Sequence, residues 1–267
     1  MTPAIPLEVT GLWRRQAMIH PDGRRDTTTQ VLWLQTRHLF ADLRVPADRP
    51  SVPGATGFAD YDAESLPRLA RMQGFAGTLE VTGDICRWHR ELDFQPPGGP
   101  PDEAKFRIEG ETLVETGIHA AYEEIWERQT PPGADLASFR LLPAKPGPRG
   151  VLVLAGDHFI AVEERRPKLP EAASLASLLA RDPDRRRASD LLGLLIAAGR
   201  LGPAGGTGWQ IELATFPWLE GRTLAPGGSR FDPVKGRLHM ETAEGLRHWQ
   251  LVEASCSLDR LGVILGT

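Results

Sequence analysis

The chain has 267 residues, 41% of them hydrophobic and 25% charged, so its composition is that of a globular protein and excludes a largely disordered chain. Its 31 Lys and Arg residues against 35 Asp and Glu residues give a formal net charge of −4, which argues against a nucleic acid as the partner. Two cysteines cannot build a disulfide framework, and this number fits a reducing compartment.

No basic stretch followed by an apolar one occurs at the start of the sequence, so no signal peptide is expected. The longest apolar run, residues 191–198, is far shorter than the roughly 18 residues that a membrane-spanning helix needs. The sequence therefore predicts a cytoplasmic protein with no membrane partner.

Alternation of apolar and polar residues dominates the first 165 residues and predicts many short β-strands. The predicted strands, in chain order, are 11–19, 30–37, 39–45, 77–81, 85–94, 105–109, 112–116, 121–128, 138–142, 150–154 and 158–163. Turn triplets such as Thr82-Gly83-Asp84 separate neighbouring strands, as in antiparallel hairpins. Short strands joined by tight turns, with few crossover helices, predict an antiparallel barrel or sandwich.

Helical patterns interrupt the strands in two places. Residues 62–73 carry apolar side chains at helical spacing, with Pro67 in the first turn and Gly74 after the end. Residues 171–198 are predicted as two helices separated at Asp182-Pro183-Asp184. The β pattern returns at 209–216, 237–241 and 247–254.

The first predicted strand begins with Gly11-Leu12-Trp13. In calycin barrels, which include the lipocalins and the fatty-acid-binding proteins, a Gly-x-Trp at this place lets the chain cross the barrel floor, which the indole then closes. The position of the tripeptide, ahead of a run of hairpins, favours a barrel over a sandwich.

Three further stretches resemble a group of bacterial proteins related to the fungal HRI proteins, which are lipocalin-like. They are residues 31–46, 86–97 (Cys-Arg-Trp-His-Arg-Glu-Leu-Asp-Phe-Gln-Pro-Pro) and 115–126 (Glu-Thr-Gly-Ile-His-Ala-Ala-Tyr-Glu-Glu-Ile-Trp). The resemblance covers residues 10–165 most closely and implies a lipocalin-like β fold that can consist of two β halves. It implies no catalytic residues.

The predicted fold is therefore mainly β: an antiparallel calycin or lipocalin-like β-barrel with a helical insertion near residues 171–198. A single domain over residues 1–267 is expected. The alternative is a first β-barrel over residues 1–165, followed by a second, smaller β and helical half over residues 166–267.

The predicted strand 85–94 separates a polar row from an apolar one. The polar row consists of Arg87, His89, Glu91 and Asp93, and the opposite face carries Cys86, Trp88, Arg90, Leu92 and Phe94. The polar row is either a solvated outer face or an inner one, in which Arg87 and His89 bind an anionic group. Arg90, on the apolar face, needs a carboxylate or carbonyl partner if it is buried.

Two other strands carry polar residues that share a face with aromatic ones. Tyr122 and Glu124 lie on the same face as Trp126 and are candidates for an acid and a base over a small substrate. Ordinary core packing with an ion pair between Glu124 and an arginine is the alternative. Asp42 and Arg44, near Trp33, either orient a ligand or form a structural ion pair.

No metal and no cofactor is expected. His89 and Glu91, like His239 and Glu241, place two possible ligands on one strand face, but such pairs are common on solvated faces. The spacing of cysteines in a structural zinc site is absent, and so is the Gly-x-Ser-x-Gly of a nucleophile elbow.

These residues support two main functions and leave a third open. The first is binding of a small, mostly apolar ligand with one polar or anionic end inside a β-barrel cavity. The residues expected to contact that ligand are Trp33, Asp42, Arg44, Arg87, Trp88 and Trp126.

The alternative is a cofactor-independent lyase or isomerase acting on a small organic acid or ketone in the same cavity. The candidates for its proton transfers are Tyr122, Glu124, His89 and Asp93. The third is a protein-interaction module carried by the helical insertion, and the oligomeric state stays open, a homodimer included.

Overall fold

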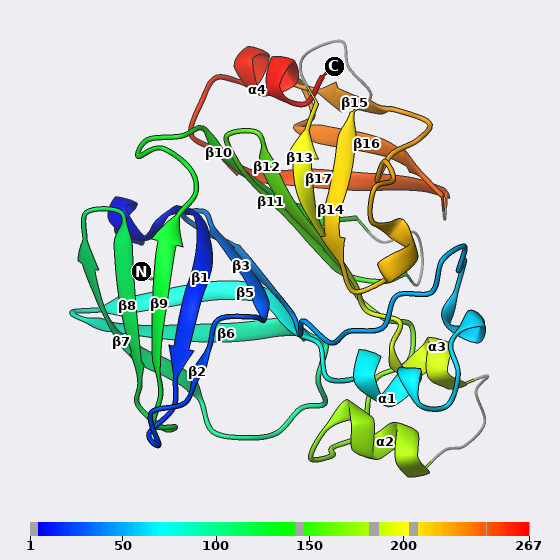
Figure 1. Ribbon diagram of the computed structural model, residues 1–267. Helices are drawn as coiled ribbons and strands as arrows, with labels where there is room; N and C mark the ends of the chain where they lie inside the picture. Colours follow the sequence, from blue (N-terminus) through cyan, green and yellow to red (C-terminus); the bar gives the residue numbers. More distant parts are fainter. Residues whose placement is uncertain (1–4, 143–146, 182–186, 203–207, 244, 267) are drawn as a thin grey trace.

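The computed structural model describes residues 5–142, 147–181, 187–202, 208–243 and 245–266. Two antiparallel sheets form the molecule, and they lie beside each other with a group of short helices at one end (Figure 1). The first sheet is built from the N-terminal half of the chain and the second from the C-terminal half.

The first sheet closes into a barrel. Its strands are β1 (Gly11–Ile19), β2 (Arg25–Asp26), β3 (Gln30–Gln35), β4 (Phe40–Val45), β5 (Gln73–Thr82), β6 (Ile85–Asp93), β7 (Asp102–Glu109), β8 (Thr112–Gly117) and β9 (Glu123–Arg128). The nine strands follow the order β2-β1-β3-β4-β5-β6-β7-β8-β9, and β1 also pairs with β9. All strands except the short β2 therefore form a closed, eight-stranded antiparallel barrel of the lipocalin-like type that the sequence predicts.

The second sheet is open. Its strands are β10 (Leu136–Leu141), β11 (Gly150–Ala155), β12 (His158–Glu163), β13 (Leu195–Leu201), β14 (Trp209–Ala214), β15 (Ser229–Asp232), β16 (Arg237–Thr242) and β17 (Gly245–Ala254). They follow the order β14-β13-β12-β11-β10-β17-β16-β15. The two sheets divide between β9 and β10, earlier than residue 165, because β10, β11 and β12 pair with strands that come later in the chain. The division of the chain into one domain or two stays a prediction.

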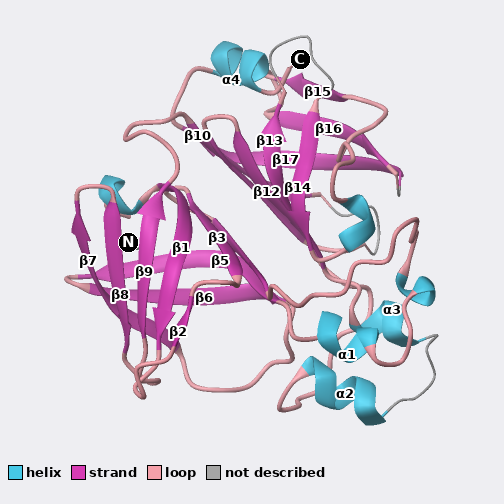
Figure 2. Cartoon of the chain, in the orientation of Figure 1, coloured by secondary structure: helices cyan, strands magenta, loops and turns pink. Residues whose placement is uncertain are grey.

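The helices are shorter than predicted. The predicted helix 62–73 contains only α1 (Ser65–Leu69), because β5 already begins at Gln73. The insertion contains α2 (Leu175–Arg181) and α3 (Ala188–Leu191), and α4 (Leu258–Ile264) lies near the C-terminus (Figure 2). The predicted break at residues 182–184 lies outside the described residues. The buried residues of α2 and α3 pack into the apolar core between the sheets.

The end of the predicted insertion, residues 195–198, is strand and not helix. In β13 the side chains of Leu195 and Ala197 pack on one side of the sheet and those of Ile196 and Ala198 on the other. Because the strand is buried on both faces, its sequence is a continuous apolar run, which periodicity cannot distinguish from a buried helix. The short strands β2 and β15 were also not predicted.

The largest apolar core lies between the barrel and the second sheet. Leu34 and Leu43 from the outer face of the barrel pack there with Val153 and Ile196 of the second sheet. A second core fills the other face of the second sheet, and a third fills the barrel. The barrel thus rests on the second sheet through a continuous apolar contact.

Trp13 lies at the end of the barrel where β1 begins, opposite the last residue of β9, and this is the place at which the Gly-x-Trp tripeptide predicts an indole that closes the floor. Its side chain is 0% exposed, its Nε1 donates a hydrogen bond to the Val9 carbonyl oxygen (2.8 Å), and the Arg128 guanidinium lies 4.2 Å from the ring centroid. Gly11 has a φ of +114°, and a Cβ there would lie 2.6 Å from Thr130 Oγ1. The residue at this position must therefore be glycine for the chain to enter β1. The opposite end of the barrel is its mouth.

In the described part of the chain, no helix is long and apolar enough to cross a membrane.

Candidate ligand-binding site at the barrel mouth

A cavity of about 670 Å³ opens where the barrel mouth meets the second sheet. Its walls come from the end of β6 and the segment that follows it, from the chain around β8 and β9, and from the segment after β12. The apolar part of the lining includes Trp88, Leu169 and Leu194, and charged side chains surround it. A volume of several hundred Å³ is typical of sites for small molecules.

The barrel interior itself is filled. Trp33 lies with its ring centroid 5.7 Å from that of Trp88 and 5.9 Å from that of Trp126. The cavity that these three side chains line with Arg44 and Glu115 measures about 10 Å³, room for about one water molecule. Ligand-sized space is therefore found at the mouth, where Trp88 lines both cavities.

A β-bulge decides which side chains of β6 face the mouth. Along β5 and β6, Gly77 pairs with Arg90 but the preceding Ala76 pairs with Leu92, which leaves Glu91 as an extra residue. Gly77 permits this close approach, because a Cβ at that position would lie 1.9 Å from the carbonyl oxygen of His89. The bulge ends the simple alternation of β6.

Arg87 and His89 lie outside the barrel, where both side chains are exposed. Arg87 pairs with Glu103, and His89 Nε2 lies 3.2 Å from Glu80 Oε2. The polar row is thus a solvated outer face at these two positions, and neither residue lines the mouth cavity. Glu91, at the bulge, accepts two hydrogen bonds of 2.7 and 2.8 Å from Arg140 of the second sheet.

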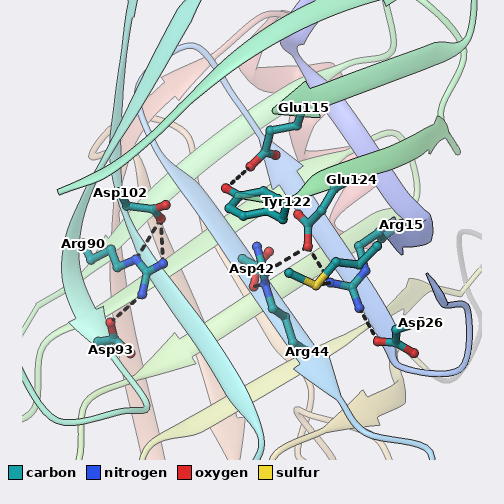
Figure 3. Close-up of polar contacts among 11 residues, drawn as sticks. Arg15, Asp26, Asp42, Arg44, Arg90, Asp93, Asp102, Glu115, Tyr122 and Glu124 are labelled. Carbon is teal, nitrogen blue, oxygen red and sulfur yellow. Dashed lines mark hydrogen bonds and ion pairs between the residues drawn. The ribbon is translucent and has the colours of Figure 1, made fainter. Parts of the chain in front are cut away.

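Arg90 lies before the bulge and Asp93 after it; both line the mouth cavity, and their side chains meet (Figure 3). The Arg90 guanidinium lies 3.7 Å from the ring centroid of Phe75 and donates hydrogen bonds to Asp102 (2.6 and 2.9 Å) and to Asp93 (3.2 Å). The expectation of a partner applied to a buried Arg90, whereas the side chain is exposed and pairs with carboxylates all the same. Burial raises the pKa of Asp93, whereas the positive charge of Arg90 acts in the opposite direction.

Asp42, Arg44 and Glu124 form a buried network inside the barrel (Figure 3). Arg44 Nε donates to Asp42 Oδ1 (3.0 Å), and its Nη1 donates to Glu124 Oε1 (3.3 Å). Glu124, which is 1% exposed, also accepts a hydrogen bond of 2.5 Å from Arg15, an arginine that sequence reasoning did not single out. Arg15 in turn pairs with Asp26 at 2.8 Å. These ion pairs make the Asp42 and Arg44 side chains structural partners.

Tyr122 lines the mouth cavity, but its hydrogen-bond partner is Glu115 and not Glu124. Tyr122 Oη donates to Glu115 Oε1 over 2.8 Å, and Glu115 is 4% exposed. Burial, together with the negative charge of Glu124, raises the pKa of Glu115 to about 8, so that this carboxyl group is largely protonated at neutral pH. Burial and the neighbouring Glu115 raise the pKa of Tyr122 as well.

Glu115 could have been found from the sequence only through strand pairing. It shares the inner face of β8 with Leu113, and its register partner on β9 is Glu124. The shared face with Leu113 follows from the alternation of residues 112–116, but the pairing with Glu124 is not visible without the barrel, because the two glutamates lie on different strands.

Arg165 is the other cavity residue that sequence reasoning missed. It follows β12 and is 6% exposed, and its Nη2 donates to the carbonyl oxygens of Phe94 (2.6 Å) and Asp93 (3.4 Å). Its Nε and Nη1 are buried without a hydrogen-bond partner among the described residues. Burial lowers the pKa of Arg165 to about 10, which still leaves the guanidinium charged at neutral pH.

Among the described residues, no group of three or more His, Cys, Asp or Glu side chains could hold a metal ion. His239 and His248 lie close together on β16 and β17, with their Nδ1 atoms 2.7 Å apart. Burial and the neighbouring His248 lower the pKa of His239.

Comparison with solved structures confirms the resemblance at the level of the fold. The chain is similar to the uncharacterized, HRI-like protein YLR301w from Saccharomyces cerevisiae, with a TM-score of 0.56, 13% sequence identity and coverage of 96% of this chain and 100% of that one. A lipocalin-like protein from Bacteroides uniformis matches 46% of this chain and 99% of its own, with a TM-score of 0.31 and 12% identity. The fold with both sheets is therefore shared with the yeast protein.

Comparison by sequence matches a smaller part of the chain. No family model matches the chain. A stretch of 71 residues is 35% identical to a 4-hydroxy-tetrahydrodipicolinate synthase from Cellvibrio japonicus. It makes up 27% of this chain and spans 24% of the length of that relative.

Proposed function

We propose that the protein binds a small, mostly apolar molecule with one polar or anionic end in the cavity at the barrel mouth. The observation that carries this proposal is the cavity of about 670 Å³, which combines apolar and charged residues in its lining and lies where the barrel meets the second sheet. Concave sites with an apolar lining and a few polar groups are the usual sites for small molecules.

The position of the cavity supports binding at the mouth over binding deep in the barrel. The tryptophans and the buried ion pairs fill the interior and hold β1, β4 and β9 together. A ligand at the mouth contacts Trp88 and Tyr122 and leaves this network intact. Of the residues expected from the sequence, Trp88, Tyr122 and Asp93 line the mouth cavity, whereas Trp33, Asp42, Arg44 and Trp126 line the small interior one.

Titration with N-phenyl-1-naphthylamine, a neutral dye that fluoresces in apolar surroundings, tests the proposal. We expect saturable binding of one dye per chain. Leu169→Trp places a larger side chain at the cavity wall and should weaken binding by about tenfold or more. Leu7→Trp makes the same change at an exposed position outside the cavity and should leave binding unchanged. Equal binding by all three proteins, or none that saturates, would contradict the proposal.

A cofactor-independent lyase or isomerase is the second candidate, and the contact between Tyr122 and Glu115 favours it. A protonated carboxyl group that is hydrogen-bonded to a tyrosine at a cavity wall can supply a proton to a bound oxygen. Turnover of a small organic acid or ketone by the wild-type chain, lost in Tyr122→Phe and retained in Glu109→Gln, a substitution at an exposed position outside the cavity, would support it. The stretch shared with 4-hydroxy-tetrahydrodipicolinate synthase is too short to add support.

A further inference from the structure

We infer that the ligand of the mouth cavity is an amphiphilic monocarboxylate, whose carboxylate binds the buried guanidinium of Arg165 while its apolar part lies against Trp88 and Leu169. This inference rests on the proposed binding function and adds the chemical class of the ligand and the residue that recognises it. It comes from the charges that line the cavity and from the donors of Arg165.

The carboxylates that line the cavity already have cationic partners. Within the described residues, the pairs are Asp93 and Asp102 with Arg90, Glu91 with Arg140, Glu103 with Arg87 and His119, and Glu164 with Arg149. In the same part of the chain, Arg165 and Lys168 line the cavity and have no carboxylate within ion-pair distance. Within this set Arg90 pairs with two of the five carboxylates, so their arginine partners number four, and Arg165 and Lys168 raise the cations around the cavity to six. The cavity and the partners of its carboxylates thus carry one positive charge more than they balance, which favours an anion.

Arg165 has a structural role that accounts for only part of its guanidinium. Through Nη2 it ties the end of β6, at Asp93 and Phe94, to the segment after β12. This contact explains why the side chain is buried but leaves Nε and Nη1 without acceptors among the described residues. A buried charged donor without a partner is costly, so a small turn of the Arg165 side chain that brings Nε or Nη1 to a ligand oxygen in the cavity would remove a penalty that the folded chain carries.

The number of buried charges indicates a single negative charge on the ligand. Arg165 contributes one buried positive charge, and Lys168 is exposed at the cavity rim. A carboxylate balances one guanidinium, whereas a doubly charged phosphate would bring a second buried charge without a buried partner. Guanidinium donors also match the geometry of carboxylate oxygens. The apolar wall suits a hydrocarbon chain or ring attached to that carboxylate.

Competition for the bound dye tests the inference. Decanoate and 1-decanol differ in the head group alone. Decanoate is ionised at pH 7.5, because carboxyl groups such as those of Asp and Glu have pKa values of about 4. We expect decanoate to displace N-phenyl-1-naphthylamine from the wild-type chain at a concentration about tenfold lower than 1-decanol does. In Arg165→Met, the affinity for decanoate should fall by about tenfold or more, with that for 1-decanol changing less than about threefold.

Lys168→Met is the matched control, because it removes a cation at the exposed rim and keeps Arg165. It should weaken decanoate by less than about threefold, since an exposed charge acts through water. The comparison of the two competitors on the wild-type chain needs no variant and stays decisive if Arg165→Met does not fold.

The outcomes separate the inference from the proposed function. If the dye does not bind at the mouth, the proposed function fails and the inference fails with it. If the dye binds but 1-decanol displaces it as well as decanoate does, the cavity binds apolar molecules without recognising a carboxylate, and the inference alone is wrong. A loss of decanoate affinity in Lys168→Met as large as that in Arg165→Met would also contradict the role of Arg165.

Discussion

Glu115 shows how a single residue acquires an unusual property from its surroundings. It lies inside a closed barrel, it is hydrogen-bonded to Tyr122, and Glu124 is its register partner on the next strand. Burial and the neighbouring carboxylate both favour the protonated form, which is why its pKa rises from 4.5 to about 8. The group is therefore neutral in the folded chain at a pH at which it would be ionised in the unfolded chain.

This difference makes stability depend on pH. Between about pH 4.5 and pH 8 the folded state holds a proton at Glu115 that the unfolded state releases, so the free energy of unfolding falls as the pH rises through this range. Glu115→Gln removes the titration and keeps a hydrogen-bond acceptor for Tyr122. From pH 5 to pH 8, urea unfolding should show that the wild type loses roughly 3 kcal/mol more than Glu115→Gln does.

Glu109→Gln makes the same substitution at an exposed position on the neighbouring strand β7 and should retain the pH dependence of the wild type. Parallel pH profiles for the wild type and Glu115→Gln would show that Glu115 is ionised in the folded chain.

At the level of single residues, sequence reasoning found the charged residues whose partners lie on the same strand. It missed the charged residues whose partners lie on a distant strand. The pairing of Asp42 with Arg44 is visible as a spacing of two residues within one strand. Arg15, Glu115 and Arg165 are isolated charged residues in the sequence, and they become part of a network or a cavity wall through contacts with distant strands. Such contacts need the register of the sheet, which periodicity does not supply.

At the level of elements, the strands were predicted well because their alternation reflects one buried face. Gly11–Ile19 and His158–Glu163 begin and end where the sequence indicates. The prediction for β6 failed at the bulge, because one extra residue moves Asp93 to the inner side while Arg87 and His89 stay outside. β13 was missed for a different reason, since burial on both faces removes the alternation.

The floor of the barrel is the element whose sequence signature is most specific. Trp13 packs against Trp33 with a centroid distance of 6.4 Å, and its Nε1 donates to the carbonyl oxygen of Val9. Trp13→Ala leaves a large cavity at the end of the barrel and should lower the free energy of unfolding by roughly 3–5 kcal/mol. Urea unfolding, followed by far-ultraviolet circular dichroism, measures this change.

Trp13→Phe keeps an aromatic ring at the floor and should cost clearly less than Trp13→Ala. A loss below about 1 kcal/mol in Trp13→Ala would mean that the indole does not support the floor.

At the level of the whole molecule, the two sheets share their largest apolar core. The outer face of the barrel covers one face of the second sheet, with α2 and α3 at the edge of the same core. Arg140 on β10 and Arg165 after β12 add polar contacts to Glu91 and Phe94 at the end of the barrel. The mouth cavity lies at this junction, so the same contacts that join the sheets also form its walls.

Because separation of the sheets would expose this core, we predict that they unfold as one cooperative unit. Leu113→Ala tests the prediction, since Leu113 is buried in the core inside the barrel, which is distinct from the core between the sheets. The substitution should lower the free energy of opening of buried amides by about 2–5 kcal/mol, and by the same amount in β11 of the second sheet as in β9 of the barrel. Native-state hydrogen exchange measures both. A loss of protection confined to the barrel strands would show instead that the chain consists of two independently stable halves, and the shared core would then be a docking surface between them.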